Sequence, residues 1–191
     1  MPSKKITTAI EPGAIYHIYN RGNNYQKVFF RESDYTLFLE KFKHYMLKVC
    51  SLYAFVLIPN HYHLLLRVND NIEGIMFSNQ FSKFMLSYTN FINRRDRRNG
   101  SLFLCRFRRI KIENDNYLRR LVFYINHNAV KHKITEDYRN YRYSSYQILT
   151  FDNPTKLSRD EVLSWFDGKA GFIEFHAVLH GHDSNSKYNL E

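Results

Sequence analysis

The sequence has little or none of what marks several common protein classes. Its 191 residues include two cysteines, Cys50 and Cys105, which are too few for a disulfide framework or a zinc site and favour a reducing cytosol. No apolar run approaches the about 20 residues that a membrane-spanning helix needs, and the N-terminus lacks the apolar stretch of a signal peptide. Internal repeats and low-complexity segments are absent as well. These absences predict a cytoplasmic protein with no membrane partner.

Negative charge is also scarce. The chain has 18 acidic residues against 28 lysines and arginines, which gives a net charge of +10. Hydrophobic residues make up 44% of the chain and aromatic residues 17%, enough to build a core. A basic surface on an aromatic-rich domain favours nucleic acid as the partner, although an acidic protein would satisfy the charge too.

Two apolar runs, residues 53–58 and 61–68, are separated by the turn signal Pro59-Asn60 and predict a pair of strands. Side chains two apart in a strand point the same way. His61, His63, Leu65 and Arg67 therefore share one face of the second strand, and an apolar set shares the other. We expect the apolar face to be core and the histidine face to lie away from it.

The histidine pair has two interpretations. Neutral imidazole is a common metal ligand, so His61 and His63 on one face could hold a metal ion. Alternatively, one histidine caps the turn and the other is a satisfied edge residue. A motif of this kind needs a supporting context before it indicates a site.

The remaining elements predict an α+β fold. We expect strands at residues 14–20 and 103–112, and helices at about 34–49, 72–94 and 115–130, with Ser33 or Asp34 and Asn114 or Asp115 as the N-caps. The second helix is expected to carry Ile75, Met76, Asn79, Phe84 and Tyr88 on its packed face. Weaker elements follow at 141–149, after Ser158 and at 172–179.

The order of these elements is a split βαββαβ pattern, which predicts a ferredoxin-like antiparallel sheet with helices on one face and the other face free. The third helix is additional to that pattern. Residues 1–150 are predicted to form the main domain, and residues 151–191 a helical extension that packs on it or trails from it.

A basic stretch runs through the second half of this pattern and holds a single acid, Asp96. Its cations are Arg94, Arg95, Arg97, Arg98, Arg106, Arg108, Arg109 and Lys111. A solvated helix usually interleaves both signs of charge, so the imbalance favours phosphate contact over a merely solvated face. We therefore expect these residues to bind nucleic acid with a strong salt dependence.

The third helix combines an apolar stripe with two polar residues beside it. The stripe consists of Leu118, Leu121, Val122, Ile125 and Ala129. Tyr124 lies off this stripe by about a third of a turn, and Asn128, four residues on, stands over the same flank. On the helix alone, these two would be an ordinary tyrosine at the edge of the core and an Asn near a helix end.

Together these motifs resemble the single-tyrosine HUH transposases (the Y1 superfamily), and among them the REP-associated tyrosine transposases. The similarity covers roughly residues 13–147. The segments that carry it are Tyr16-His-Ile-Tyr-Asn-Arg-Gly22, Ile58-Pro-Asn-His-Tyr-His-Leu-Leu66, Gly100-Ser-Leu-Phe103, Phe123-Tyr-Ile-Asn-His-Asn-Ala-Val130 and Tyr143-Ser-Ser-Tyr146. The chain departs from the family pattern at Ala129, where Pro is usual, at Tyr143, where Trp is usual, and at the bulky Tyr62.

The resemblance implies a role for each residue of the two motifs. His61 and His63 would bind a divalent metal, Mg²⁺ or Mn²⁺, and Tyr124 would be the nucleophile that forms a 5′-phosphotyrosine. Asn128 would be the third ligand, with its neighbour His127 as the alternative. The implied substrate is a single-stranded or hairpin DNA, handled by a monomer or a homodimer.

The sequence thus predicts a metal-dependent single-stranded DNA endonuclease and strand transferase that serves DNA transposition. A domesticated transposase with a cellular role would have the same sequence features. The rival hypothesis is a non-catalytic module that binds single strands on a ferredoxin-like sheet, as RRM proteins do. The RRM aromatic motif is absent, and a binder has no need of His61, His63 and Tyr124 together.

Overall fold

The computed structural model describes residues 8–104 and 107–183. The first half of the chain forms β1 (Ile15–Arg21), a 3-10 turn η2 (Asn23–Tyr25), α1 (Glu32–Met46), β2 (Cys50–Ile58), β3 (His61–Val68) and α2 (Gly74–Arg95). The second half forms β4 (Arg108–Ile112), α3 (Asp115–Lys131), a 3-10 turn η3 (Tyr138–Asn140), α4 (Tyr146–Thr150), α5 (Arg159–Ser164) and α6 (Lys169–Asp183). None of the helices in these two ranges combines the length and apolar character needed to cross a bilayer.

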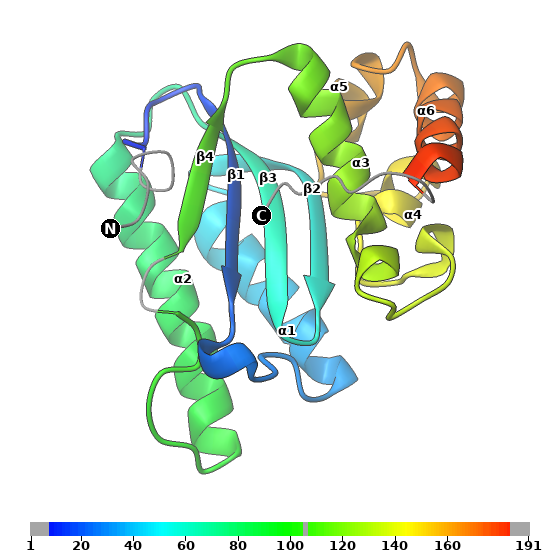
Figure 1. The fold of residues 1–191 in the computed structure, drawn as a ribbon. Helices are drawn as coiled ribbons and strands as arrows, with labels where there is room; N and C mark the ends of the chain where they lie inside the picture. Colours follow the sequence, from blue (N-terminus) through cyan, green and yellow to red (C-terminus); the bar gives the residue numbers. More distant parts are fainter. Residues whose placement is uncertain (1–7, 105–106, 184–191) are drawn as a thin grey trace.

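The four strands form one sheet in the order β2-β3-β1-β4 (Figure 1), and every pair of neighbours is antiparallel. This order, built by a βαββαβ chain, is the ferredoxin-like arrangement, so the predicted fold is confirmed. The strand β3, which starts at His61, is central in this sheet and has a neighbouring strand on each side.

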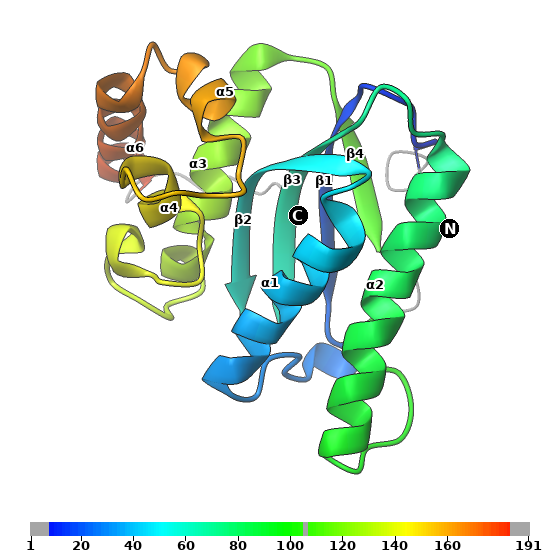
Figure 2. The same ribbon diagram turned by 180° about the vertical axis from the view of Figure 1, so that it is seen from behind.

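One face of the sheet is covered by α1 and α2, which lie in front of it in the view of Figure 2. The core on this face is almost entirely aromatic and aliphatic. Its largest fully buried members are Tyr16, Phe29, Phe38, Phe42, Phe55, Tyr62, Phe77, Phe81, Phe84 and Tyr88. Apolar residues in β1, β2 and β3 alternate toward this core, which fixes the register of the central strands.

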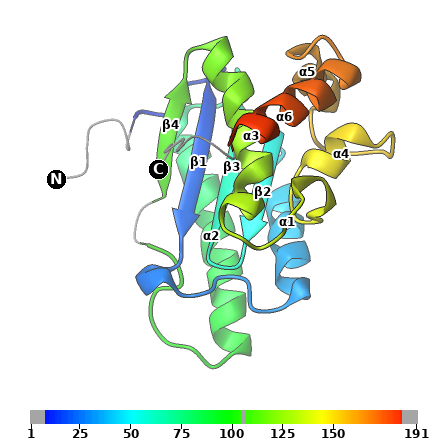
Figure 3. The same cartoon turned by 45° about the vertical axis from the view of Figure 1, so that its right-hand side comes forward.

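The opposite face is not free, contrary to the expectation from the sequence. The helix α3 returns across it and packs on β2 and β3, with α4, α5 and α6 beyond it (Figures 1 and 3). A second core forms here from Ala54, Val56 and Leu65 of the sheet and the predicted stripe of α3. Residues after 151 contribute to it through Val162, Phe166 and Phe172.

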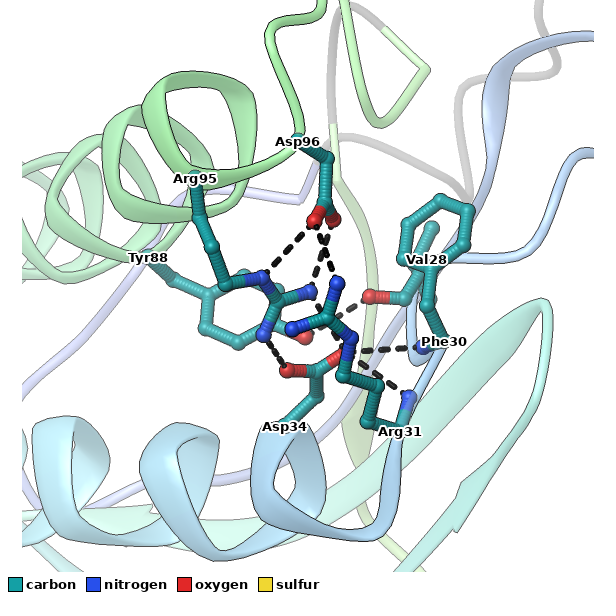
Figure 4. Close-up of polar contacts among 7 residues, drawn as sticks. All are labelled: Val28, Phe30, Arg31, Asp34, Tyr88, Arg95 and Asp96. Atoms are coloured by element: carbon teal, nitrogen blue, oxygen red, sulfur yellow. Dashed lines mark hydrogen bonds and ion pairs between the residues drawn. The ribbon is translucent and has the colours of Figure 1, made fainter.

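An ion-pair cluster joins the start of α1 to the end of α2 (Figure 4). The Asp34 carboxylate is fully buried and accepts hydrogen bonds from the backbone N–H groups of Phe30 (2.8 Å) and Arg31 (3.0 Å). The Arg95 guanidinium contacts the same carboxylate and also Asp96, at 2.7 Å. Burial alone would raise the pKa of Asp34, but Arg95 and the two backbone donors outweigh it and hold that pKa below its ordinary value.

Three predictions about where an element or its buried face begins are wrong. The N-cap of α1 is Arg31, and Asp34 caps the helix from its third position. The core stripe of α2 begins at Phe77, whereas Ile75 and Met76 are exposed. The strand expected over residues 103–112 is shorter, because Phe103 forms only an isolated bridge with Gly22 and the continuous ladder starts at Arg108.

Candidate active site

The polar residues of β1 and β3 lie side by side because the two strands are in antiparallel register. His63 pairs with Tyr19, and His61 pairs with Arg21. The side chains of these pairs point to the face covered by α3. The His63 ring stacks on the Tyr19 ring with centroids 5.4 Å apart, and His63 Nδ1 lies 2.9 Å from His17 Nε2. The sheet therefore presents a group of rings rather than two isolated histidines.

The helix α3 brings the predicted nucleophile and third ligand onto this group. Asn128 Oδ1 lies 3.1 Å from His61 Nε2, and the Tyr124 ring meets the His63 ring edge-on with centroids 5.5 Å apart. Residues four apart share one face of a helix, so a single helix orientation places both side chains over β3. His61, His63, Tyr124 and Asn128, predicted from two distant segments, are thus gathered in one place.

The burial of this group differs from the expectation of an exposed face. His61 is 8% exposed, His63 2%, Tyr124 6% and Asn128 fully buried. The histidine pair lies beneath α3, and Tyr124 belongs to the second core rather than to its margin. Burial first, and then the neighbouring His17 and His61, hold the pKa of His63 well below its ordinary value, so His63 is neutral and keeps a lone pair at neutral pH.

The hydrogen bonds around His61 and His63 suit metal ligands. His61 Nδ1 lies 2.9 Å from Asn60 Oδ1, and both Asn60 and Asn128 turn amide oxygens toward the ring. A neutral imidazole has one N–H, so it can donate to only one of two acceptors. If Nδ1 donates to Asn60, Nε2 turns a lone pair toward the Asn128 oxygen at 3.1 Å, an arrangement that a shared cation would stabilise.

His63 offers a second donor atom to the same place. Its Nε2 is buried and has no hydrogen-bond partner within the part of the chain that the structure describes. If Nδ1 donates to His17, the Nε2 lone pair is available, which is the usual pattern for a histidine ligand. Among described residues no three His, Cys, Asp or Glu side chains cluster to hold a metal, so a site here depends on the Asn128 oxygen. The two imidazoles and the amide oxygen fit a divalent cation.

His127, the alternative third ligand, faces elsewhere. Its Nε2 lies 2.9 Å from His180 Nδ1 of α6, and its ring stacks on Phe123. It therefore contributes to the packing of α6 on α3, and the geometry favours Asn128 as the residue that complements the histidine pair.

A cleft of about 370 Å³ opens beside the histidines. Its lining residues are polar or aromatic apart from Leu104 and include no carboxylate: Tyr19, Asn20, Arg21, Tyr25, Asn60, His61, His63, Leu104, Arg108 and His132. Arg21 and Arg108 give it positive charge. A cleft with these walls suits an anionic, partly flat ligand.

The predicted DNA-binding cations do not form one surface. Of these cations that the structure describes, only Arg108 lines the cleft. Alternation along β4 turns Arg109 and Lys111 to the α2 side, where Arg109 Nε donates to Thr8 O and Lys111 pairs with Glu11. Arg95 is held in the ion-pair cluster. Arg94 and Arg97 are exposed, Arg98 donates to Gln26 at 2.5 Å, and Arg106 lies outside the described residues.

Several residues of the site were not singled out from the sequence. His17, Tyr19 and Arg21 alternate along β1 at the period of a strand, which places them on one face, and this spacing could have indicated them. Asn60 lay within the recognised turn. His132, whose ring meets His61 edge-on at 4.6 Å, follows the end of α3 and had no signal of its own.

Comparison with known proteins supports the fold. No protein-family model matches the chain, and no curated protein matches it in sequence. Among solved structures, one similar chain is a REP-associated tyrosine transposase bound to a REP hairpin, with a TM-score of 0.63 and 18% identity. The similarity covers 76% of this chain and 84% of that one. At this identity, the likeness establishes a shared fold.

Proposed function

We propose that this protein is a metal-dependent single-stranded DNA endonuclease and strand transferase of the transposase type. The observation that carries the proposal is the proximity of four side chains. His61 Nε2 lies 3.1 Å from Asn128 Oδ1, the His61 and His63 ring centres are 5.2 Å apart, and the Tyr124 ring meets the His63 ring edge-on. The shared fold with a hairpin-bound tyrosine transposase supports it. The cleft with Arg21 and Arg108 gives the DNA strand a place to approach His61 and His63, which line it.

In this proposal Tyr124 is the nucleophile. Its phenolic oxygen attacks the phosphorus, the bond to the 3′ oxygen breaks, and the products are a 5′-phosphotyrosine and a free 3′-hydroxyl. The proton lost by the tyrosine balances the one gained by the 3′ oxygen. Because the phosphotyrosine remains a phosphodiester, a second 3′-hydroxyl can reverse the step and join strands. An ordinary tyrosine has a pKa of about 10, so attack needs help in removing this proton.

His61, His63 and Asn128 are the proposed ligands of a divalent cation, Mg²⁺ or Mn²⁺. When bound, such a cation neutralises phosphate charge and polarises the phosphorus. Asn60 and His17 orient the two imidazoles toward it. The burial that keeps His63 neutral preserves its lone pair for this purpose. Arg108 and Arg21, at the cleft, neutralise phosphates that flank the reacting one.

The decisive experiment is Tyr124→Phe, tested on single-stranded hairpin oligonucleotides with Mn²⁺. The change removes one oxygen and keeps the ring contacts with His63 and with Lys131, whose ammonium lies 5.0 Å from the ring centre. We expect hairpin binding equal to the wild type, no covalent protein–DNA adduct and no nicked product. The measurements are a gel shift and a denaturing gel.

Tyr117→Phe is the matched control, because Tyr117 lies on the same helix nearly two turns away and outside the cleft. This variant should form adducts like the wild type. An adduct that persists in Tyr124→Phe would contradict the assignment. A wild type that binds hairpins but forms no adduct on any of them would favour the non-catalytic binding module instead.

A further inference from the structure

Tyr25 stands apart from the other tyrosines at the cleft. It is 67% exposed, and it has a left-handed backbone conformation with φ 57°, directly after Asn24 with φ 51°. Two consecutive residues other than glycine in this region store backbone strain, which persists only where the surroundings enforce it and which concentrates at functional sites. A tyrosine needed only for packing would be buried, as Tyr16 and Tyr62 are.

The turn that presents Tyr25 is fastened on both sides. Gly22 N–H donates to Asn60 O at 2.7 Å, which ties the turn to the residue before His61. The Gln26 side chain donates to Leu102 O at 2.9 Å on the opposite side. A Cβ on Gly22 would come 2.0 Å from Gln26 O, so only glycine permits this close approach. The backbone that carries Tyr25 is therefore held in place next to the turn that precedes His61.

A guanidinium lies against this ring. The Arg21 Cζ atom is 3.7 Å from the centre of the Tyr25 ring, and both residues line the cleft that His61 and His63 border. Arg21 is the partner of His61 in the β1–β3 register. The Arg21–Tyr25 pair therefore lies next to the candidate metal ligands. A nucleobase can stack on an aromatic face, and a neighbouring guanidinium can bind the phosphate of the same nucleotide.

We propose that Tyr25 and Arg21 form a platform on which one unpaired nucleobase stacks next to the scissile phosphate. This inference rests on the proposed function and specifies its substrate. The nucleotide at this position must be single-stranded, because a paired base has no free face to offer. Every base has a π face, so the platform selects unpaired from paired nucleotides rather than one base from another.

The test measures binding in the presence of chelator, so that no strand is cut. A fluorescent hairpin with a single-stranded flank is titrated with wild type and with Tyr25→Ala. We expect Tyr25→Ala to bind about 5- to 150-fold more weakly, the range for loss of one base–aromatic stack. Tyr25→Phe should bind like the wild type, because the ring is kept. Phe151→Ala, which removes a ring that is 54% exposed and outside the cleft, should also have no effect.

A second set of oligonucleotides locates the stacked base. One abasic site is moved along the flank, and the affinity of wild type and Tyr25→Ala is compared at each position. At one position the abasic site should weaken wild-type binding and have no further effect on Tyr25→Ala, because the same contact is already lost. Thermal melting of Tyr25→Ala should match the wild type, since the residue is exposed.

The platform and the proposed function fail in different ways. The platform is wrong if Tyr25→Ala binds like the wild type. It is also wrong if Tyr25→Ala loses the same affinity relative to the wild type on every abasic oligonucleotide. In both cases adduct formation by the wild type still supports the proposed function. If duplex flanks bind as well as single-stranded flanks, the platform is also wrong. A wild type that neither binds nor cleaves any single strand overturns both.

Discussion

The two faces of the sheet are built on opposite principles. Under α1 and α2 nearly all the buried side chains of the sheet are apolar, and the buried carboxylate of Asp34 in α1 lies at the margin with its partner Arg95. Under α3 the sheet buries His17, His61 and His63, and the helix adds Asn126 and Asn128. Burying polar groups costs free energy unless hydrogen bonds or a ligand compensate. The first face buries almost only apolar side chains, whereas the second combines an apolar core with the buried polar groups of the candidate site.

Removing a proposed metal ligand should have the largest effect, and only on the second face. We expect His63→Ala to lower the rate of adduct formation about 10⁴-fold or more, which is about 5.5 kcal/mol in activation free energy, because phosphate charge is no longer neutralised. Chelator should do the same to the wild type.

Binding provides an independent readout of the same ligand set. Mn²⁺ should raise the melting temperature of the wild type, since a ligand that binds only the folded state stabilises it, and should leave that of His63→Ala unchanged. Adduct formation by His61→Ala in chelator at the rate of the wild type without chelator would rule the metal site out.

The first face should respond in the opposite way. Phe38→Ala removes a fully buried ring beneath α1 and should lower the free energy of unfolding by about 4 kcal/mol, through lost transfer free energy and the cavity left behind. The folded fraction should form adducts at the wild-type rate well below the melting transition. Chemical denaturation measures the first quantity, and a rate normalised to folded protein the second. A large rate defect would mean that the faces are coupled.

The ion-pair cluster at the margin should have an intermediate effect. Arg95→Ala leaves the buried Asp34 carboxylate without its guanidinium, and we expect a loss of about 3 kcal/mol, the low end for a buried pair because Arg95 keeps 20% of its side chain exposed. Arg94→Ala, one residue earlier and exposed, is the control and should stay within about 0.5 kcal/mol.

The stabilisation from the Asp34–Arg95 pair should depend on pH in a defined direction. The pKa of Asp34 is lowered in the folded state, so its contribution is present above the unfolded pKa of about 3.9 and is lost as the pH falls through the folded value. The stability difference between wild type and Arg95→Ala should therefore shrink in acid. A difference that grows on acidification would contradict the role of the pair.

Much of the secondary structure could be predicted because local patterns determine it. Period-two alternation gave β3 its correct bounds, His61–Val68, and the Asn114 side chain caps α3 as expected by accepting from Tyr117 N–H at 3.0 Å. The order of elements then leaves few topologies for an antiparallel sheet.

The second face could be predicted only in part, for a physical reason. An amphipathic stripe shows that α3 packs on something, but not on which side of the sheet, so the burial of Tyr124 was missed. The position of Tyr124 and Asn128 four residues apart still indicated that they lie on the same flank of the helix. The spacing of His17, Tyr19 and Arg21 could have indicated a shared face of β1, but not the contact of His17 with His63, which is 46 residues away.

The smallest expected effect separates the two faces along a single strand. Arg108 lines the cleft, whereas Arg109, the next residue, points to the α2 side and donates to Thr8 O. We expect Arg108→Ala to flatten the dependence of log affinity on log salt for single strands by about 0.7, the value for one lost phosphate contact, and Arg109→Ala to leave the slope unchanged. Titrations of a labelled oligonucleotide at several salt concentrations measure it. Because both variants remove the same charge from the same strand, equal slopes would show that overall charge, and not the face on which an arginine lies, governs binding. A change confined to Arg109→Ala would place the DNA on the face of α1 and α2, opposite to Tyr124.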